Sequence, residues 1–257
     1  MQGLVAADDP DLRQSLSDLS RLASAAMALP DMLTNIAEFA VQAIPGADGA
    51  GLTLMEHDRP DTVVANADFV GEIDAIQYDL GEGPSLTAVA EGRTVRSGLL
   101  STAPAWPRFG PRSERLGVHS ALSLPLLVGA SVIGSLNVYA RAADAFDERA
   151  EELGELFAVP ASISVQNAQT LSQATRLAAQ LQTALTSRAT IDQAMGIVMS
   201  RSGCTADEAF HKLRQISQAD NIRLSLVARS ILDQAVQRVR ARATSEAQET
   251  RSLPRQT

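Results

Sequence analysis

One narrow apolar seam in the second half of the chain limits how this sequence can fold. Its members follow one another at alternating steps of three and four residues: Leu171, Ala174, Ala178, Leu181 and Leu185. This spacing predicts one continuous helix whose apolar stripe is as narrow as that of a coiled coil. The stripe suits either a parallel dimer or packing against the same chain. We therefore expect a connecting coiled-coil helix over residues 169–187, with a separate domain on each side of it.

A similar seam opens the chain, within residues 1–29. The same spacing relates Leu12, Leu16, Leu19, Ala23 and Ala26, and Pro30 ends the pattern. Two and a half heptads fit a dimer coiled coil and a helix packed on its own domain equally well. Because two seams flank one domain, we expect a homodimer that forms through the N-terminal and linker helices.

Residues 30–168 alternate between helix-like and strand-like segments. Asp31 can cap a helix that runs to Ala43, and residues 146–168 return to a helical pattern. Between them we expect a short helix over residues 85–91 and strands over residues 50–55, 62–65, 94–96, 122–127 and 131–139. The fold class is therefore α+β, an antiparallel sheet with flanking helices.

The sequence gives no signal for export or membrane insertion. The first ten residues contain two aspartates and no basic residue, unlike a secretory signal. The stretch between Arg115 and Arg141 is uncharged and long enough to cross a bilayer. Its proline, glycines and serines favour two strands joined by a turn instead. We expect a cytoplasmic protein with no membrane partner.

Residues 188–240 have the clearest pattern, that of three short helices. The first ends at Gly203, Thr205–Glu208 has the sequence of a capping box that opens the second, and the third begins near Leu224. These features predict a compact three-helix bundle. Residues 241–257 are rich in polar residues and have no apolar pattern, so we expect a flexible tail there.

Charge is divided unequally along the chain. The net charge of −8 combines −13 over residues 1–170 with +5 over residues 171–257, and a basic end suits a polyanionic partner. A single cysteine, Cys204, excludes a disulfide framework, and the three histidines lack a metal-binding spacing. The only lysine, Lys212, excludes a lysine-dependent phosphate loop. We expect no metal, no cofactor and no catalytic activity.

Three segments of the basic end follow one another in a specific order: Ile191-Asp-Gln-Ala-Met-Gly-Ile-Val-Met-Ser-Arg201, Thr205-Ala-Asp-Glu-Ala-Phe-His-Lys-Leu-Arg-Gln-Ile-Ser-Gln218 and Asn221-Ile-Arg-Leu-Ser-Leu-Val-Ala228. Together they resemble an ANTAR domain. The resemblance implies an RNA-binding module of a transcription antitermination regulator. Many such domains have Lys where this chain has Met195, so one phosphate contact is missing here.

Four further segments lie in the first 165 residues: Tyr78-Asp-Leu-Gly-Glu-Gly-Pro-Ser85, Trp106-Pro-Arg-Phe109, Gly117-Val-His-Ser-Ala-Leu-Ser-Leu-Pro125 and Gly134-Ser-Leu-Asn-Val-Tyr139. In combination they resemble a GAF domain, a ligand-sensing α+β module. The two halves together resemble a GAF–ANTAR regulator. Many relatives have Cys where this chain has Ser85, which argues against thiol redox sensing.

The apolar faces of the three C-terminal helices leave a second, polar surface. We expect it to contact RNA through Arg188, Gln193, Gly196, Ser200, Arg214, Ser217, Gln218, Asn221 and Arg223. Each arginine taken alone also fits a solvated helix surface, and Ser217 and Gln218 could merely satisfy a helix end. Gly196 costs about 1 kcal/mol within a helix relative to Ala. It serves either close helix packing or the close approach of a nucleic acid.

Phe210 is the only aromatic residue after residue 170, and its spacing predicts a core position. We therefore expect no exposed aromatic platform for unpaired bases, which would stack on arginine or aliphatic surface instead. This favours a structured RNA loop. The family resemblance implies a pair of small-loop hairpins, one of which overlaps a terminator, and two hairpins suit a dimer.

Three residues are candidates for a sensor pocket. Ser85 follows a glycine-rich turn, Trp106 lies in a loop between prolines, and His119 begins a strand. Each has a structural alternative, which is to open a helix, anchor a loop or end a strand. The signal, a small molecule or a protein, cannot be identified from these residues.

The sequence therefore predicts a signal-responsive, dimeric RNA-binding protein that prevents transcription termination. A DNA-binding regulator is the alternative, since three helices joined by a short turn also describe a helix-turn-helix unit. Against that alternative, the arginines do not concentrate on one recognition helix.

Overall fold

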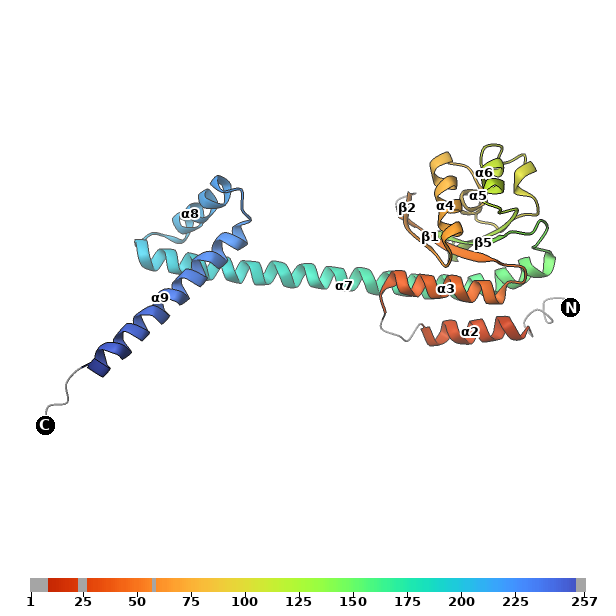
Figure 1. Cartoon of the computed structure of the whole chain (residues 1–257). Coiled ribbons are helices and arrows are strands. Elements are labelled where there is room, and N and C mark those ends of the chain that lie inside the picture. Colours follow the sequence, from red (N-terminus) through yellow and green to blue (C-terminus); the bar gives the residue numbers. More distant parts are fainter. Residues whose placement is uncertain (1–8, 23–26, 57–58, 253–257) are drawn as a thin grey trace. The chain divides into compact units, whose positions relative to one another are not determined.

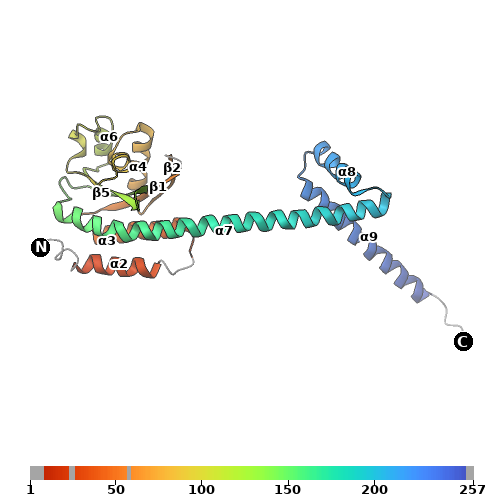
Figure 2. The same ribbon diagram turned by 180° about the vertical axis from the view of Figure 1, so that it is seen from behind.

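The computed structural model describes residues 9–22, 27–56 and 59–252. Contacts divide the chain into two units, Met1–Gln173 and Ala174–Thr257. The first unit is built around a sheet, and the second is entirely helical in its described part (Figures 1 and 2).

The sheet of the first unit has five antiparallel strands in the order β2-β1-β5-β4-β3. Their bounds are Gly49–Glu56 for β1, Arg59–Ala65 for β2, Val95–Ser97 for β3, Ser120–Val128 for β4 and Ser131–Ala140 for β5. The five predicted strands are confirmed, each within a few residues. The uncharged stretch forms the β4–β5 hairpin, as expected, and Gly129 takes a positive φ in its turn. Among the described helices, none has a segment that is both long and apolar enough for a bilayer.

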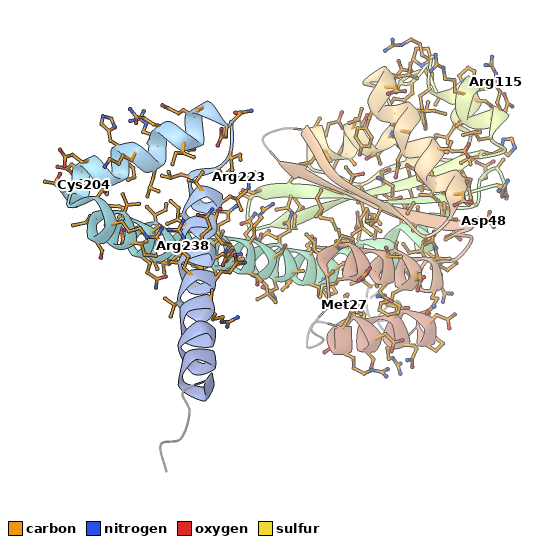
Figure 3. The ribbon with its side chains drawn as sticks, turned by 60° about the vertical axis from the view of Figure 1, so that its left-hand side comes forward. Met27, Asp48, Arg115, Cys204, Arg223 and Arg238 are labelled. Atoms are coloured by element: carbon orange, nitrogen blue, oxygen red, sulfur yellow. The ribbon has the colours of Figure 1, made fainter. Side chains whose placement is uncertain are left out.

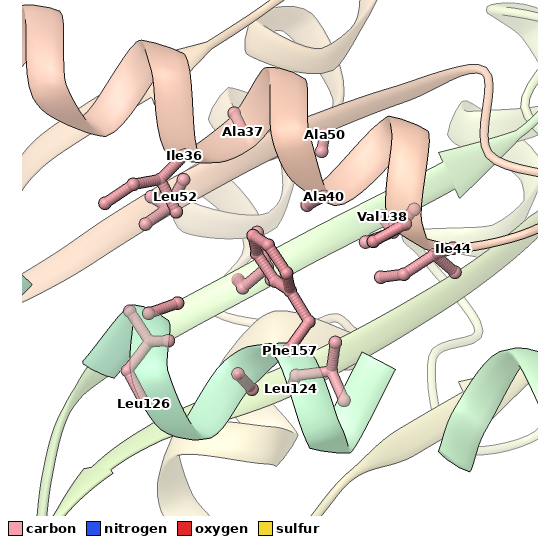
Figure 4. Packing of buried hydrophobic residues seen from close by; sticks show 14 of the residues in the cluster. Ile36, Ala37, Ala40, Ile44, Ala50, Leu52, Leu124, Leu126, Val138 and Phe157 are labelled. Carbon is pink, nitrogen blue, oxygen red and sulfur yellow. The ribbon is translucent and has the colours of Figure 1, made fainter. Parts of the chain in front are cut away.

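One face of the sheet is apolar because residues alternate along each strand. Leu52 on β1 lies opposite Leu136 on β5, which in turn lies opposite Leu124 on β4. Helix α3 (Leu29–Ala43) and the first part of α7 (Glu148–Ser202) cover this face. Figure 4 shows Phe157 of α7 reaching into the space between the sheet and α3. This is the larger of the two cores of the first unit.

Helix α2 (Pro10–Leu22) extends the same core instead of offering a free seam. Its Leu12 and Leu19 are buried, and Asp9 at its start forms an ion pair of 2.6 Å with Arg149 of α7. The prediction of a dimer coiled coil at the N-terminus is therefore wrong for these leucines, because the helix packs on its own domain. The remaining seam residues, Ala23 and Ala26, lie outside the described residues.

Two details at the start of α3 differ from expectation. Pro30 does not end the first helix but lies in the first turn of α3, where a missing N–H is tolerated. Asp31 follows it within that turn, and Ala28 is the N-cap. The predicted apolar side of the helix is confirmed, because Leu33, Ile36, Ala37 and Ala40 are all buried.

The other face of the sheet is covered by α4 (Asp68–Leu80), α5 (Pro84–Glu91) and α6 (Gly110–Arg115), with a 3-10 turn at Leu100–Thr102. Sequence patterns had predicted only α5. Helix α4 has a mixed composition, with the polar residues Asp74 and Gln77 buried toward the sheet. Its pattern is therefore not that of an ordinary amphipathic helix.

Helix α7 runs from Glu148 to Ser202 without a break. It includes the predicted connecting segment, whose leucines are exposed in the single chain: Leu171 by 64%, Leu181 by 57% and Leu185 by 65%. The alternative that this seam packs against its own chain is therefore wrong. The seam remains free for another partner.

The second unit contains the end of α7, helix α8 (Ala206–Ala219) and helix α9 (Leu224–Ser252). Gly203 ends α7 at a φ of 63°, and Thr205 and Glu208 form the predicted capping box. The core consists of Ala194, Leu213, Val227 and Ala228, with partly buried residues around them.

Helix α9 continues to Ser252, so the prediction of a tail from residue 241 is wrong over most of its length. Residues 241–252 are mainly alanine, arginine, glutamate, glutamine, serine and threonine, and none is glycine or proline. Such a sequence can continue a helix without an apolar face.

Candidate functional site

The polar surface of the second unit is the first candidate site. Arg188, Gln193, Ser200, Arg214, Gln218 and Arg223 are all exposed, as predicted for residues that meet a partner. The structure gives none of these three arginines an ion-pair partner among the residues it describes. Figure 3 shows Arg223 at the beginning of α9. Their charge is therefore not neutralised by an ion pair with a described residue.

Gly196 lies in the middle of α7 and is exposed. A Cβ added at this position would meet no atom within 4 Å outside the local helix backbone and the adjacent residues. Close helix packing, one of its two possible explanations, is therefore excluded for this unit. Of the two explanations given above for a glycine that weakens this helix, the close approach of a nucleic acid is the one that the packing of the unit leaves open.

Ser217 and Asn221 shape the turn between α8 and α9. The hydroxyl group of Ser217 donates a hydrogen bond of 2.6 Å to the carbonyl oxygen of Ile222. Asn221 adopts a φ of 52°, a left-handed conformation that asparagine tolerates better than most residues. Both residues thus have a structural role in the turn that presents Arg223.

Phe210 is 40% exposed, so the prediction that it lies in the core is wrong. The small bundle accepts only Ala209 and Leu213 of α8 as buried residues, and Phe210 is turned away from them by its place one residue after Ala209. It lies one turn before Arg214, on the same side of α8. The surface expected to bind RNA therefore includes an exposed aromatic ring.

The second candidate site is a cluster of buried polar side chains between the sheet and α4, referred to below as the polar cluster. It comprises Thr53, Asp74, Gln77, Ser85, Ser123, Ser135, Asn137 and Tyr139, all fully buried, with Tyr78 at its edge. Strand register brings the sheet residues to one face, because Ser135 lies opposite Thr53 and Asn137 lies opposite Ser123.

Asp74 is the centre of the polar cluster. Its Oδ1 atom accepts hydrogen bonds from Tyr139 and from Gln77, the latter at 3.1 Å, with Asn137 at 3.5 Å. Burial raises the pKa of Asp74 to about 7, although these hydrogen bonds favour the charged form. Its other oxygen, Oδ2, has no hydrogen-bond partner among the described residues, and the same holds for Oδ1 of Asn137. A carboxyl group with this pKa changes its charge near neutrality.

Of the three predicted sensor residues, only Ser85 belongs to the polar cluster. Its hydroxyl group lies 2.9 Å from that of Ser135, and its backbone N–H donates to Gln77 at 2.9 Å. Trp106 is buried elsewhere and donates to the hydroxyl group of Thr87 at 3.0 Å. This makes Trp106 a loop anchor. His119 is half-buried just before β4 and lies apart from the cluster's hydrogen bonds.

The glycine turn before Ser85 holds two parts of the first unit together. Glu82 accepts hydrogen bonds from the backbone N–H groups of Arg108 and Phe109, at 2.6 and 2.9 Å, and from the guanidinium group of Arg108. Gly83 has a φ of 152°, and a Cβ there would collide with Gln77. The carboxylate of Glu82 therefore joins two of the segments that resemble a GAF domain, Tyr78–Ser85 and Trp106–Phe109.

Sequence reasoning missed Asp74, Gln77, Asn137 and Tyr139 as members of a site. A signal was present in β5, where polar or hydroxyl-bearing residues at 135, 137 and 139 alternate with apolar ones. Such alternation in a central strand indicates a polar face that is covered by another layer. Nothing local in the sequence connects that face to Asp74.

Comparison with known protein families agrees with this division of the chain. The family model of the GAF domain matches residues 26–166, and that of the ANTAR domain matches residues 179–232. Among curated proteins, none matches the chain.

Several solved structures are similar to the first unit. A GAF domain from a phosphoenolpyruvate-protein phosphotransferase of Coxiella burnetii is 18% identical, with a TM-score of 0.48 over 63% of this chain and 97% of that one. Free methionine-R-sulfoxide reductase of Neisseria meningitidis is 17% identical, with a TM-score of 0.46 over 64% and 95%. The type II enzyme of Thermoplasma acidophilum is 16% identical, with a TM-score of 0.41 over 53% and 92%.

Proposed function

The chain belongs to the GAF domain family and carries an ANTAR domain after its GAF domain, and from this we propose that it is a signal-responsive antiterminator that binds paired RNA hairpins. Both domains are regulatory modules, which suits a protein without catalytic activity. Binding to hairpins in nascent RNA would hold an antiterminator form and let transcription continue.

The observation that carries the proposal is that Gly196 is exposed and serves no packing in its unit, while Arg188, Arg214 and Arg223 of the same unit are exposed and have no ion-pair partner among the described residues. Because Gly196 has no side chain, a sugar–phosphate backbone or a base edge can approach α7 closely at this position. Arg214 and Arg223 supply forked donors for phosphates and base edges. The exposed ring of Phe210 adds a face on which one unpaired loop base can stack.

The linker seam supports a dimer. Leu171, Leu181 and Leu185 project from one stripe of α7 and are exposed in the single chain, which suits a coiled coil with a second copy. Two linked copies present two RNA-binding surfaces. Occupation of one then raises the effective concentration of the second for a neighbouring hairpin.

The polar cluster is the proposed place at which the GAF domain responds to its signal. It holds unpartnered buried acceptors at Asp74 and Asn137, and such groups favour any ligand or conformational change that supplies donors to them. Signal binding would then alter the sensor end of α7 and, through it, the RNA-binding state.

The test is a gel-shift titration of the full chain with a library of small-loop hairpins, single and paired, beside duplex DNA at matched salt. We expect tight binding to a subset of paired hairpins and weaker binding to the duplex. Arg214→Ala should weaken hairpin binding about tenfold or more. The matched control is Arg115→Ala, which removes an exposed arginine from the first unit. This change should leave the affinity for hairpins unchanged.

Three results would contradict the proposal. Equal competition by duplex DNA would favour the DNA-binding alternative. Equal losses for Arg214→Ala and Arg115→Ala would assign binding to overall charge. Absence of hairpin binding by both the full chain and its 186–240 fragment would remove the RNA-binding function altogether.

A further inference from the structure

A groove of about 300 Å³ lies between α7 and α9 in the second unit. Its polar lining comes from Gln182, Thr183, Thr186, Ser187 and Thr190 on α7 and from Ser225 and Arg229 on α9. None of these residues belongs to the surface for which RNA contacts were predicted. The groove therefore needs an explanation of its own.

The three threonines of the groove can accept hydrogen bonds but have no proton left to donate. The hydroxyl group of Thr183 donates to the carbonyl oxygen of Ala179 at 2.8 Å, and Thr190 donates to that of Thr186 at 2.8 Å. Thr186 donates to Gln182 in the same way, at 2.9 Å. A hydroxyl group has one proton and two lone pairs, so a ligand must bring its own donors to these oxygens.

On the α9 side of the groove, Arg229 supplies hydrogen-bond donors and a positive charge. Its side chain is exposed, and the described part of the chain provides no ion-pair or hydrogen-bond partner for it. A guanidinium group supplies five donors and a permanent positive charge, in a geometry that suits phosphate. The groove thus pairs a phosphate-binding group with a row of acceptors.

We propose that this groove binds the RNA sugar–phosphate backbone, with a phosphate on Arg229 and a ribose 2′-hydroxyl group donating to the threonine oxygens. In RNA the ribose carbon that bears the 2′-hydroxyl donor is bonded to the carbon that bears the 3′-phosphate ester, and DNA lacks that donor. The groove therefore distinguishes RNA from DNA without reading a base. This inference rests on the proposed function and deepens it.

The position of the groove supports the assignment. Gln182 and Thr186 precede Ala189, Gln193, Gly196 and Ser200 at alternating steps of four and three residues, so all six share one side of α7. The groove thus extends the exposed stripe of Gly196 toward the linker. Thr183 lies two residues from both Leu181 and Leu185, a step that turns a helix by about 200°. A coiled coil through those leucines leaves Thr183 accessible.

The experiment measures binding of the full chain to one hairpin pair that the library titration selects, in two forms. One is ordinary RNA. The other carries 2′-fluoro groups, which preserve A-form geometry but cannot donate a hydrogen bond. The protein variants are Arg229→Ala, Thr186→Val and, as a charge-matched control on the same helix, Arg238→Ala. Valine keeps the shape and the helix propensity of threonine while removing its oxygen.

We expect Arg229→Ala to weaken binding of both RNA forms about tenfold, as the loss of a charge-assisted contact does. Thr186→Val should weaken binding of ordinary RNA about threefold and leave the 2′-fluoro form unchanged. Arg238→Ala should have a smaller effect than Arg229→Ala.

Three outcomes overturn the inference, and they can be told apart. In the first, ordinary RNA binds the wild type, but Arg229→Ala weakens binding no more than Arg238→Ala does. In the second, Thr186→Val weakens binding of both RNA forms by the same factor. Either result shows that the groove is not a backbone site, while the proposed function stands. If the wild-type chain binds no hairpin, the proposed function fails and this inference fails with it.

Discussion

The hydroxyl group of Tyr139 on β5 donates a hydrogen bond to Oδ1 of Asp74 on α4, inside the sensor domain. The two residues are 65 positions apart in the chain, so this bond ties the second layer of the domain to the middle of its sheet. The charge of Asp74 therefore affects the hydrogen bond that joins α4 to β5.

The first prediction concerns pH. Burial raises the pKa of Asp74 to about 7 in the folded protein, above its ordinary value of 3.8. The folded state thus holds this proton more tightly than the unfolded chain, so the free energy of unfolding of the sensor domain falls as pH rises from about 4 to about 7 and is lowest above that range. The loss amounts to as much as about 4 kcal/mol.

Urea unfolding followed by the fluorescence of Trp106 measures this effect, because the single tryptophan is buried in the sensor domain. Asp74→Asn removes the titrating group and should flatten the pH dependence between pH 5 and about 8. Asp79→Asn, at an exposed position of the same helix, should keep the wild-type slope. A slope that persists in Asp74→Asn would show that another group titrates.

The second prediction concerns Gly196. Gly196→Ala should raise the stability of the second unit by about 0.5–1 kcal/mol, since alanine favours a helix and the added methyl group meets no neighbour. The same change should weaken hairpin binding about tenfold, because the methyl group keeps the RNA away. Circular dichroism and gel-shift titration measure the two effects. Improved stability with unchanged affinity would leave Gly196 outside the interface.

The third prediction concerns Phe210. Because its ring is 40% exposed, Phe210→Ala should cost little stability, below about 1 kcal/mol. If an unpaired base stacks on the ring, the same change should weaken hairpin binding about tenfold, whereas Phe210→Tyr retains the aromatic face and the affinity. Equal affinities for all three proteins would assign the ring no contact with RNA.

The fourth prediction concerns the linker seam. Leu181→Glu places a charge in the stripe through which we expect two copies to pair, so sedimentation should detect a dimer that is at least about tenfold weaker than in the wild type. Gln180→Glu adds the same charge at an adjacent exposed position and should leave association unchanged. A dimer that is insensitive to Leu181→Glu must form through another surface.

Structural features that depend on residues close together in the chain could be predicted from the sequence. The capping box of Thr205 and Glu208 depends on two residues three positions apart, and the β4–β5 hairpin depends on a strand pattern interrupted by Gly129. Both are confirmed. The sequence left two explanations for Gly196, and the structure removes only one of them, which is close helix packing. Contact with a nucleic acid stays a prediction.

Features set by long-range packing could not be predicted. Leu12 has the same spacing in a dimer seam and in a helix that packs on its own sheet, so the sequence alone left the partner of α2 undecided. Phe210 has the periodicity of a core residue, yet the small bundle buries only Ala209 and Leu213 of its helix. Asp74 joins the polar cluster only because α4 lies over β5.

Because α2 is part of the sensor core, the sensor domain begins earlier in the chain than the segment that matches the GAF family. The family similarity begins at residue 26, but Leu12 and Leu19 lie in the sensor core and Asp9 pairs with Arg149. A sensor domain trimmed to the family boundary would expose the part of this core that Leu12 and Leu19 cover, and it would leave Arg149 without Asp9. Such a fragment should be prone to self-association through that newly exposed surface, and a dimer measured on it would reflect the trimming rather than the native protein.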